Sequence, residues 1–249
     1  MPAVANQDKN AILMYQFPRA STIPSASPFA LKLETYFRMA GIKYESDLTG
    51  KFSKNGKIPW VVIDGQPLGD TAFITEYVNK KYNIDLDKNL SELDKSMAHS
   101  YRKMLEENTF WAAINYGRLV DNFPWLLKEL GVPSALSWIA KLTVRRRLLK
   151  NMWGHGIGRH NGEEIQSIAM QDIKACAEFL DNKPFFMGDQ PTSIDAVIFG
   201  FMAELIWFMP PDHWTIKLIT EEYTNVVDYC ERMKAKYWPD WDDNLKKTK

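Results

Sequence analysis

Cysteine is scarce in this sequence: among its 249 residues only Cys176 and Cys230 occur, and there is no CxxC motif. Two cysteines cannot build the disulfide framework of a small secreted domain, and such scarcity is typical of a reducing compartment. An excess of charge of either sign is missing too, because 31 Lys and Arg residues balance 31 Asp and Glu residues. The net charge therefore gives no indication of a nucleic-acid partner, and we expect none.

Long hydrophobic runs and targeting signals are also absent. The longest apolar stretch, residues 196–211, is interrupted by Glu204 and ends in two prolines, so it is too short to span a bilayer. Residues 1–10 have neither the apolar segment of a secretory signal nor the Arg-rich pattern of a transit peptide. We expect a cytoplasmic protein with no integral membrane segment.

The first third of the sequence has the pattern of a small α/β domain. Residues 12–17 form a short apolar run that predicts a strand, and a loop rich in Ser, Thr and Pro follows. Ser27 as N-cap, Pro28 in the first turn and Gly41 at the end delimit a helix. The remaining predicted elements are a strand at 43–47, a hairpin over 60–69 that turns at 65–66, and a helix over 72–82.

Beyond residue 90 the apolar pattern is helical. The predicted helices are 90–122, 133–153, 162–180, 193–208 and 221–237. An acidic stretch before them indicates a linker. We therefore predict a disordered leader over 1–11, an α/β domain over 12–84, a linker over 85–90 and an all-helical domain over 91–249.

Two short motifs in the α/β part combine into a candidate peptide-binding site. Pro59 directly precedes a strand in the segment 57–60 (KIPW). If the bond between Ile58 and Pro59 is cis, the amide and carbonyl of Ile58 turn outward and can pair with an extended peptide. Asp70 and Thr71 open the next helix and offer a carboxylate, a hydroxyl and helix amides. Those groups suit a ligand end that carries both an α-carboxylate and an α-ammonium. Taken alone, Pro59 can simply end strand pairing, and Asp70 or Thr71 can simply cap the helix.

In this order, the motifs resemble the cytosolic glutathione transferase superfamily. The segments that carry the resemblance are 27–30, 57–60, 69–71 and a capping box within 188–196, in which Thr192 and Asp195 cap a core helix. The resemblance covers roughly residues 12–237. Within the superfamily, the segments 27–35, 102–107 and 154–160 look most like the failed-axon-connections and metaxin-related branch.

The resemblance implies a fold, a cosubstrate and a site. It implies a thioredoxin-like domain followed by an all-helical domain, a homodimer, and glutathione as the cosubstrate at the junction of the domains. Ile58 and Pro59 are then expected to hold the cysteinyl backbone, and Asp70 and Thr71 to hold the γ-glutamyl group. Lys57 is expected to bind the glycine carboxylate, with an exposed loop position as its alternative.

Ser27 is the candidate catalytic residue. Thiolate is the reactive form of glutathione, and a serine hydroxyl at the positive end of a helix can donate a hydrogen bond to it. Ser27 aligns with the serine or cysteine position of the superfamily, and a cysteine there would instead form mixed disulfides. An ordinary N-cap is the alternative. Tyr15, Ser21 and Ser25 compete for the thiol, although Tyr15 is more typical of a buried strand aromatic.

An apolar electrophile is expected between the first-strand loop and the first long helix of the helical domain. Asn108, Trp111 and Asn115 recur at spacings of three and four residues and share a face of that helix. Phe17 lies on the loop that faces it. We predict that these four residues line the pocket, although an aromatic at helical spacing more often belongs to a core.

Two further segments are interpreted as structural. Residues 154–160 (GHGIGRH) lack both the preceding strand of a dinucleotide loop and the acidic or cysteine partners of a metal site. They predict a helix–helix connection, and we expect no metal. Residues 144–150 (VRRRLLK) predict a solvated or interfacial helix face, with contact to a membrane surface as the alternative.

The sequence thus predicts a detoxification-type enzyme that conjugates glutathione to a small electrophile. Two alternatives stay open. One is a non-catalytic adaptor with the same fold, as the branch resemblance implies. The other is a ligand-binding or stress-response protein that binds glutathione with little turnover.

Overall fold

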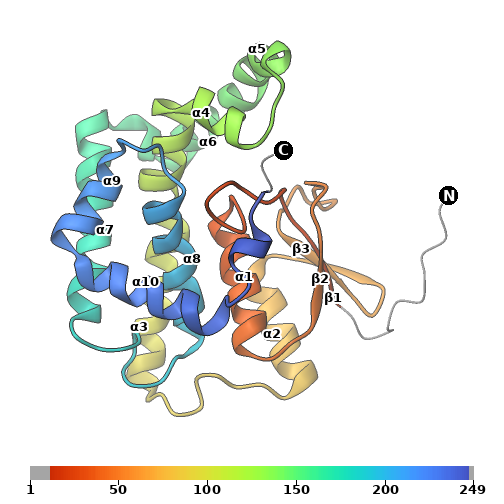
Figure 1. Cartoon of the computed structure of the whole chain (residues 1–249), viewed down its shortest axis with the longest axis vertical. Coiled ribbons are helices and arrows are strands. Elements are labelled where there is room, and N and C mark those ends of the chain that lie inside the picture. The colour runs from red at the N-terminus through yellow and green to blue at the C-terminus, as the bar shows by residue number, and fades with distance from the viewer. Residues whose placement is uncertain (1–11, 247–249) are drawn as a thin grey trace.

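The computed structural model describes residues 12–246, so the leader predicted over 1–11 lies outside the described residues. The N-terminal part is a mixed four-stranded sheet with the strand order β2-β1-β3-β4 (Figure 1). The strands are β1 (Ile12–Tyr15), β2 (Tyr44–Asp47), β3 (Trp60–Ile63) and β4 (Gln66–Gly69). Strand β1 is parallel to β2 and antiparallel to β3, which forms a hairpin with β4.

The hairpin turn falls one residue earlier than predicted. Asp64 and Gly65 occupy it, with φ angles of 53° and 76°, and two successive positive φ angles are typical of the type I′ turn that suits strand twist. Gln66 is already part of β4. Helix α2 (Thr71–Tyr82) follows directly after the hairpin.

Helix α1 (Pro28–Met39) connects β1 to β2, and its ends match the prediction. Pro28 stands in the first turn, where its missing amide costs no hydrogen bond. Gly41 follows the C-cap residue with a φ of 67°, a conformation in which glycine carries no steric penalty.

Helix α1 is buried on two sides. Leu33 and Phe37 pack with Val61 of the sheet, whereas Leu31 belongs to the hydrophobic cluster of the helical half. Figure 1 accordingly shows α1 between the sheet and the helices. The two halves therefore share this helix as a common wall.

The helical half begins with a continuous helix made of α3 (Glu92–Lys103) and η1 (Met104–Asp121), the latter with π-type hydrogen bonding. The elements that follow are α4 (Phe123–Glu129), η2 (Ser134–Leu136), α5 (Ser137–Ala140), η3 (Lys141–Arg145), α6 (Arg146–His155), η4 (Ile157–Arg159), α7 (Gly162–Leu180), α8 (Ser193–Trp207), α9 (Trp214–Lys217), η5 (Leu218–Glu222), α10 (Thr224–Tyr237) and η6 (Asp242–Asn244). The sequence does not predict α4 or α9. Across residues 12–246, no helix has the length and apolar character needed to cross a bilayer.

Helix α8 is the centre of the helical core. Residues 194–206 are buried without exception, as expected of a helix whose positions are apolar apart from Asp195 and Glu204. Asp195 fixes its start, because the carboxylate accepts the amides of Thr192 and Phe186 at 2.7 Å and the Tyr229 hydroxyl at 3.0 Å. Burial raises the pKa of Asp195, and these bonds oppose the shift. The predicted capping residues thus form a structural part of the core.

Candidate functional site

Ser27 occupies the N-cap position of α1 without using its hydroxyl as a cap. Its backbone is extended, with φ of −128° and ψ of 120°, and its carbonyl accepts the amides of Ala30 and Leu31 at 3.0 and 2.9 Å. The residue is 8% exposed. A serine hydroxyl that is not committed to a helix amide at the positive end of a helix is the geometry that a donor to a thiolate requires.

The loop before Ser27 is anchored from both halves of the molecule. Arg19 donates to a loop carbonyl at 3.0 Å and makes a two-pronged ion pair with the buried Glu34 of α1, at 2.7 and 3.0 Å. From η1, Arg118 donates to the Ala26 carbonyl at 3.2 Å. Anchors of this kind hold Ser27 in a defined position relative to both halves.

Arg118 belongs to a buried charge cluster behind this loop. Its guanidinium pairs with Glu204 of α8 and donates to the Phe208 carbonyl at 2.7 Å. Burial raises the pKa of Glu204 to about 7, and Arg118 opposes the shift. Burial, together with the Arg118 charge, lowers the pKa of His213 to about 4. A Cβ at Gly117 would lie 2.5 Å from the His213 ring, so the cluster leaves room only for glycine there.

Two of the three competing thiol ligands make other contacts. Tyr15 stacks on Trp60 across the β1–β3 pair, with ring centroids 4.0 Å apart, which is the packing of a strand aromatic. Ser21 donates to Glu129 at 2.5 Å. The Ser25 hydroxyl has no hydrogen-bond partner within the described residues, but the residue is fully buried. The contacts of Tyr15 and Ser21 and the burial of Ser25 favour Ser27 among the candidates.

The two motifs of the predicted peptide site lie side by side because β3 pairs with β4. Trp60 stands opposite Gly69, so the residues before β3 run next to those after β4. The bond between Ile58 and Pro59 is cis. Within residues 12–246, the amide and carbonyl of Ile58 make no backbone hydrogen bond. Both groups are therefore available to an extended peptide.

The start of α2 lies beside this segment. Lys57 places its Nζ 3.9 Å from Oδ2 of Asp70, and both side chains are well exposed. Asp70 adopts a φ of 73° and accepts the Ala72 amide at 3.1 Å. Its carboxylate therefore acts as a helix cap through one oxygen. Thr71 is buried at the first position of α2.

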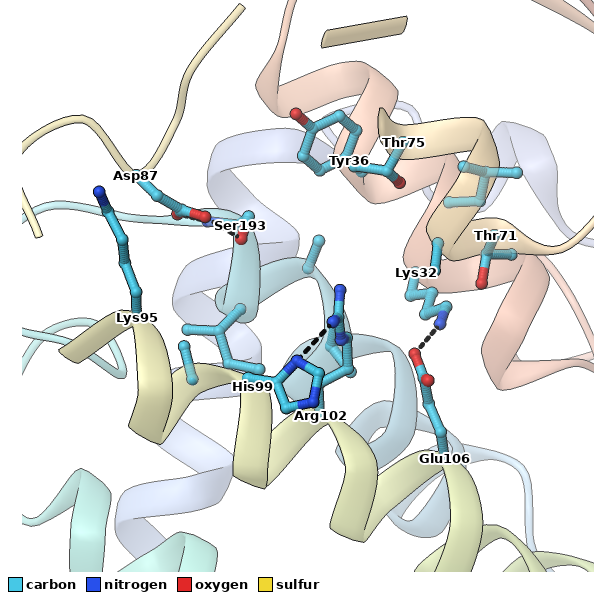
Figure 2. Close-up of a pocket in the computed structure, with 16 residues that line it drawn as sticks. Lys32, Tyr36, Thr71, Thr75, Asp87, Lys95, His99, Arg102, Glu106 and Ser193 are labelled. Atoms are coloured by element: carbon cyan, nitrogen blue, oxygen red, sulfur yellow. Dashed lines mark hydrogen bonds and ion pairs between the residues drawn. The ribbon is translucent and has the colours of Figure 1, made fainter. Parts of the chain in front are cut away.

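A pocket of about 260 Å³ opens next to Thr71, between the two halves of the molecule (Figure 2). Inside it, Lys32 of α1 pairs with Glu106 of η1. Burial lowers the pKa of Lys32, and Glu106 opposes the shift. On the facing helix α3, Arg102 contacts the His99 ring at 2.9 Å. The pocket thus places hydroxyl and cationic donors beside the predicted γ-glutamyl position. Ser27, Ile58 and Pro59 do not line it.

Three of the four residues predicted to line an electrophile pocket contact different parts of the molecule. Asn108 donates to Asp172 of α7 at 2.9 Å, and Trp111 stacks on His155 at a centroid distance of 5.1 Å. Asn115 is buried, and Phe17 packs edge-on against Phe52 of the next loop at 5.9 Å. The electrophile pocket built from Phe17, Asn108, Trp111 and Asn115 stays a prediction.

Sequence reasoning missed the face of η1 that meets α1. Phe110 packs edge-on against Phe29 at 4.8 Å, and Glu106 pairs with Lys32. These two residues of η1 lie four positions apart. A buried charge four residues from an aromatic is the signal that identifies such a face.

Residues 156–161 connect α6 to α7, so the predicted helix–helix connection is present, although Gly154 and His155 still belong to α6. The His155 ring lies 2.8 Å from the Glu107 carbonyl oxygen, and the His160 ring lies 3.2 Å from the Glu164 carboxylate. Both histidine rings thus already contact other groups of the protein.

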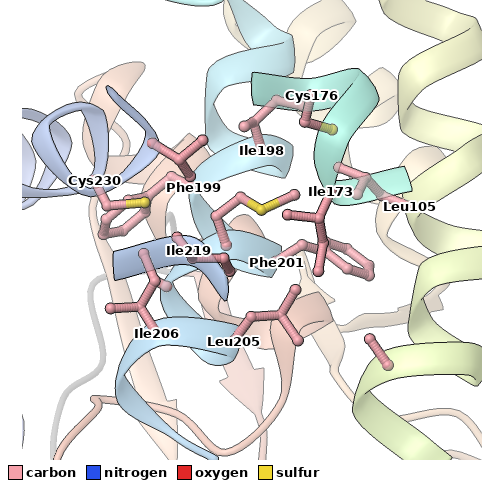
Figure 3. Close-up of a cluster of buried hydrophobic side chains, with 14 of the residues drawn as sticks. Leu105, Ile173, Cys176, Ile198, Phe199, Phe201, Leu205, Ile206, Ile219 and Cys230 are labelled. Atoms are coloured by element: carbon pink, nitrogen blue, oxygen red, sulfur yellow. The ribbon is translucent and has the colours of Figure 1, made fainter. Parts of the chain in front are cut away.

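The two thiols lie in the helical core rather than at the junction (Figure 3). Cys176 of α7 and Cys230 of α10 are buried on either side of α8, and burial raises the pKa of each thiol. Both therefore stay protonated at neutral pH and are unreactive.

Comparisons with known proteins assign the family. The model of the glutathione S-transferase N-terminal domain matches residues 28–122, and that of the C-terminal domain matches residues 169–233. An isoprene-epoxide–glutathione S-transferase from Rhodococcus sp. (strain AD45) is 31% identical, over 91% of this chain and 99% of that enzyme. The chain belongs to the glutathione S-transferase superfamily. The fold class predicted from the sequence is thereby confirmed, whereas the exact division at residues 85–90 stays a prediction.

Within the superfamily, the chain is similar to members of the predicted branch. Failed axon connections from Drosophila melanogaster is 34% identical over 96% of this chain, which spans 60% of that protein. Metaxin-2 from Mus musculus is 22% identical over 94% of this chain and 90% of that protein. A solved class Gtt2 glutathione S-transferase from Vibrio parahaemolyticus superposes with a TM-score of 0.56 at 15% identity, over 91% of this chain and 95% of that one, and this likeness concerns the fold alone.

Proposed function

We propose that this chain binds glutathione and transfers it to a small apolar electrophile, with Ser27 stabilising the thiolate. The observation that carries the proposal is the Ser27 hydroxyl, which stands at the N-terminus of α1 without capping it. The similarity to an isoprene-epoxide–glutathione S-transferase, which extends over 99% of that enzyme, supports it.

In this proposal the tripeptide lies along the junction. Ile58 pairs with the cysteinyl backbone, and Pro59 packs beside it. The α-ammonium and α-carboxylate of the γ-glutamyl group bind at Asp70 and Thr71, and Lys57 binds the glycine carboxylate. The uncommitted backbone groups of Ile58 and the donors that surround Thr71 support this placement.

The chemistry needs a thiolate and a place for the electrophile. The thiol proton leaves to solvent, and the sulfur attacks carbon. As the C–S bond forms, the bond from that carbon to its leaving atom breaks, and the electron pair stays on the leaving atom. Ser27 donates to the sulfur, and the helix N-terminus adds positive potential. Phe17, Asn108, Trp111 and Asn115 are the proposed walls of the electrophile pocket.

Calorimetric titration with glutathione and a chlorodinitrobenzene conjugation assay test the proposal. Ser27→Ala should lower kcat by about 100-fold or more, the effect typical of losing a donor to a developing anion. Its stability should hardly change, because the hydroxyl does not cap α1. If turnover is unaffected by Ser27→Ala, Ser27 is not the thiol ligand, and Tyr15→Phe tests its competitor.

Ser91→Ala is the matched control. Ser91 is also an N-cap serine, but it accepts the Asp94 amide at 3.1 Å at the start of α3. The substitution should therefore cost about 1 kcal/mol of stability and leave turnover unchanged. The pair of variants separates a catalytic serine from a capping serine.

A second candidate function is a non-catalytic adaptor. The 34% identity to Failed axon connections favours it. Absence of glutathione binding would support the adaptor, whereas binding without turnover would support a ligand-binding or stress-response role. We also propose that the chain is a homodimer, which light scattering tests. We further propose that it is cytoplasmic, which cell fractionation tests.

A further inference from the structure

One segment of this charge-balanced chain carries charge of a single sign. Between Glu129 and Glu163 the sequence contains no acidic residue. Its cations are Lys141, Arg145, Arg146, Arg147, Lys150 and Arg159. Because the whole chain has 31 basic and 31 acidic residues, this segment stands out as a local positive field.

The same segment exposes large apolar side chains. In the described part of the chain, the strongly exposed hydrophobic residues gather here more than anywhere else. They are Leu136, Trp138, Ile139, Leu142, Val144 and Trp153. Trp138 is 62% exposed, Leu142 is 52% exposed and Trp153 is 60% exposed, so burial in the core does not account for them.

The segment forms a lobe at one end of the helical half. Helix α5, η3 and α6 follow one another without interruption from 137 to 155, and no residue between 128 and 151 is buried. Figure 1 shows α5 at the tip, away from the main helical bundle. Arg145 ties the lobe to η1 through the Leu119 carbonyl at 3.1 Å. We call residues 134–155 the basic lobe.

We propose that the basic lobe binds the surface of an anionic lipid membrane. Exposed tryptophan and leucine side chains insert at the boundary between headgroups and acyl chains, and the neighbouring cations contact lipid phosphates and carboxylates. Tryptophan suits this boundary because its ring is apolar and its indole N–H is polar. The contact is peripheral and does not depend on glutathione binding.

The charge of the basic lobe favours an anionic lipid surface over a second copy of the chain as the binding partner. A two-fold symmetric contact places the same patch on both subunits. Arg146 and Arg147 would then face the cations of the other copy with no acidic residue of the lobe to offset them. A lipid surface supplies the opposite charge without that conflict.

Sedimentation of the full chain with lipid vesicles tests the proposal. Vesicles of phosphatidylcholine with about 30% phosphatidylserine should bind the chain, and pure phosphatidylcholine should not. Arg146→Glu combined with Arg147→Glu should weaken binding roughly 30-fold or more, because each cation near an anionic surface contributes about fivefold. Added salt should weaken binding of the wild type.

A second variant tests the apolar part, and two controls match the changes. Trp138→Ser combined with Leu142→Ser should weaken binding and reduce the blue shift of tryptophan fluorescence that vesicles cause. Lys54→Glu with Lys88→Glu, and Leu93→Ser, alter exposed residues elsewhere and should bind as the wild type does. Circular dichroism checks that every variant is folded.

Three results would overturn the proposal. The first is no binding to the anionic vesicles. The second is binding that the lobe variants leave unchanged. The third is self-association of the wild type in light scattering that Arg146→Glu with Arg147→Glu abolishes, since this would assign the lobe to a contact between copies.

Discussion

Glu204 pairs with Arg118, and the charge of Arg118 also acts on His213. As pH rises, the titrations of these two residues change the free energy of unfolding in opposite directions. Folded His213 stays neutral down to about pH 4, although an ordinary histidine titrates near 6.5. Its contribution to stability is therefore present above pH 6.5 and is lost as pH falls toward 4. The pKa of Glu204 is raised from 4.5 to about 7. Its contribution is present below pH 4.5 and is lost as pH rises toward 7.

Replacing His213 isolates one of these titrations. We expect the free energy of unfolding of the wild type minus that of His213→Asn to increase as pH rises from 4 to 6.5. The slope should be at most about 1.4 kcal/mol per pH unit, the value for one proton. Urea titrations at several pH values measure it. A difference that is constant over this range would mean that His213 is not held neutral by the fold.

The sequence predicts the role of a single residue best when that role depends on its neighbours in the chain. Ser27, Pro28 and Gly41 delimit α1 because caps and turns depend on neighbours in the chain. Arg118 and Glu204 escape prediction for the opposite reason. They lie 86 positions apart, and a charged residue in a helix is indistinguishable from a solvated one until its partner is known.

Helix α1 is joined to η1 by a buried ion pair. The side chains of Lys32 and Glu106 are 6% and 8% exposed, so each depends on the other to offset its charge. Lys103 also approaches Glu106, at 3.6 Å, but from the surface. The pair thus controls how closely the two helices pack beside the pocket.

Breaking this pair on one side should be costly. Lys32→Met alone should lower the free energy of unfolding by about 3–5 kcal/mol, because Glu106 is left buried without its partner. Adding Glu106→Leu should restore much of this loss, because two packed apolar side chains need no charge compensation. Denaturant unfolding of the two single variants and the double variant measures the coupling energy.

Lys95→Met is the control for this cycle. Its partner Glu92 is 90% exposed, so the substitution should leave stability unchanged. If the single and double variants of the buried pair lose equal stability, the loss comes from packing at these positions rather than from an isolated charge.

Elements were predictable where the chain carries a strong local signal, and not where tertiary contact defines them. The apolar run of α8 predicts a core helix because it is apolar at nearly every position and too long for a buried strand. Helix α4 has only seven residues, too few for a clear period. The segment after α10 is placed by distant partners, since Asp240 pairs with Arg38 and the Lys246 amide donates to the Ala20 carbonyl at 2.7 Å.

This C-terminal segment couples the two halves of the molecule. Trp238 is 1% exposed, and its indole N–H donates to Thr35 of α1 at 3.0 Å. Arg38 of α1 stacks over the same ring at 3.8 Å. Ala196 of α8 also packs into the cluster of the sheet. Because the hydrophobic clusters interlock through α1, α8 and this tail, the halves are expected to unfold together.

Trp238→Ala tests this coupling. Loss of a buried tryptophan should lower the free energy of unfolding by about 3–5 kcal/mol, and differential scanning calorimetry should show one transition that moves to lower temperature as a whole. Trp153→Ala makes the same chemical change at a side chain that is 60% exposed, and it should leave the transition in place. Two separate transitions, in the wild type or in Trp238→Ala, would contradict the coupling, because the sheet and the helices would then melt as independent units despite sharing α1.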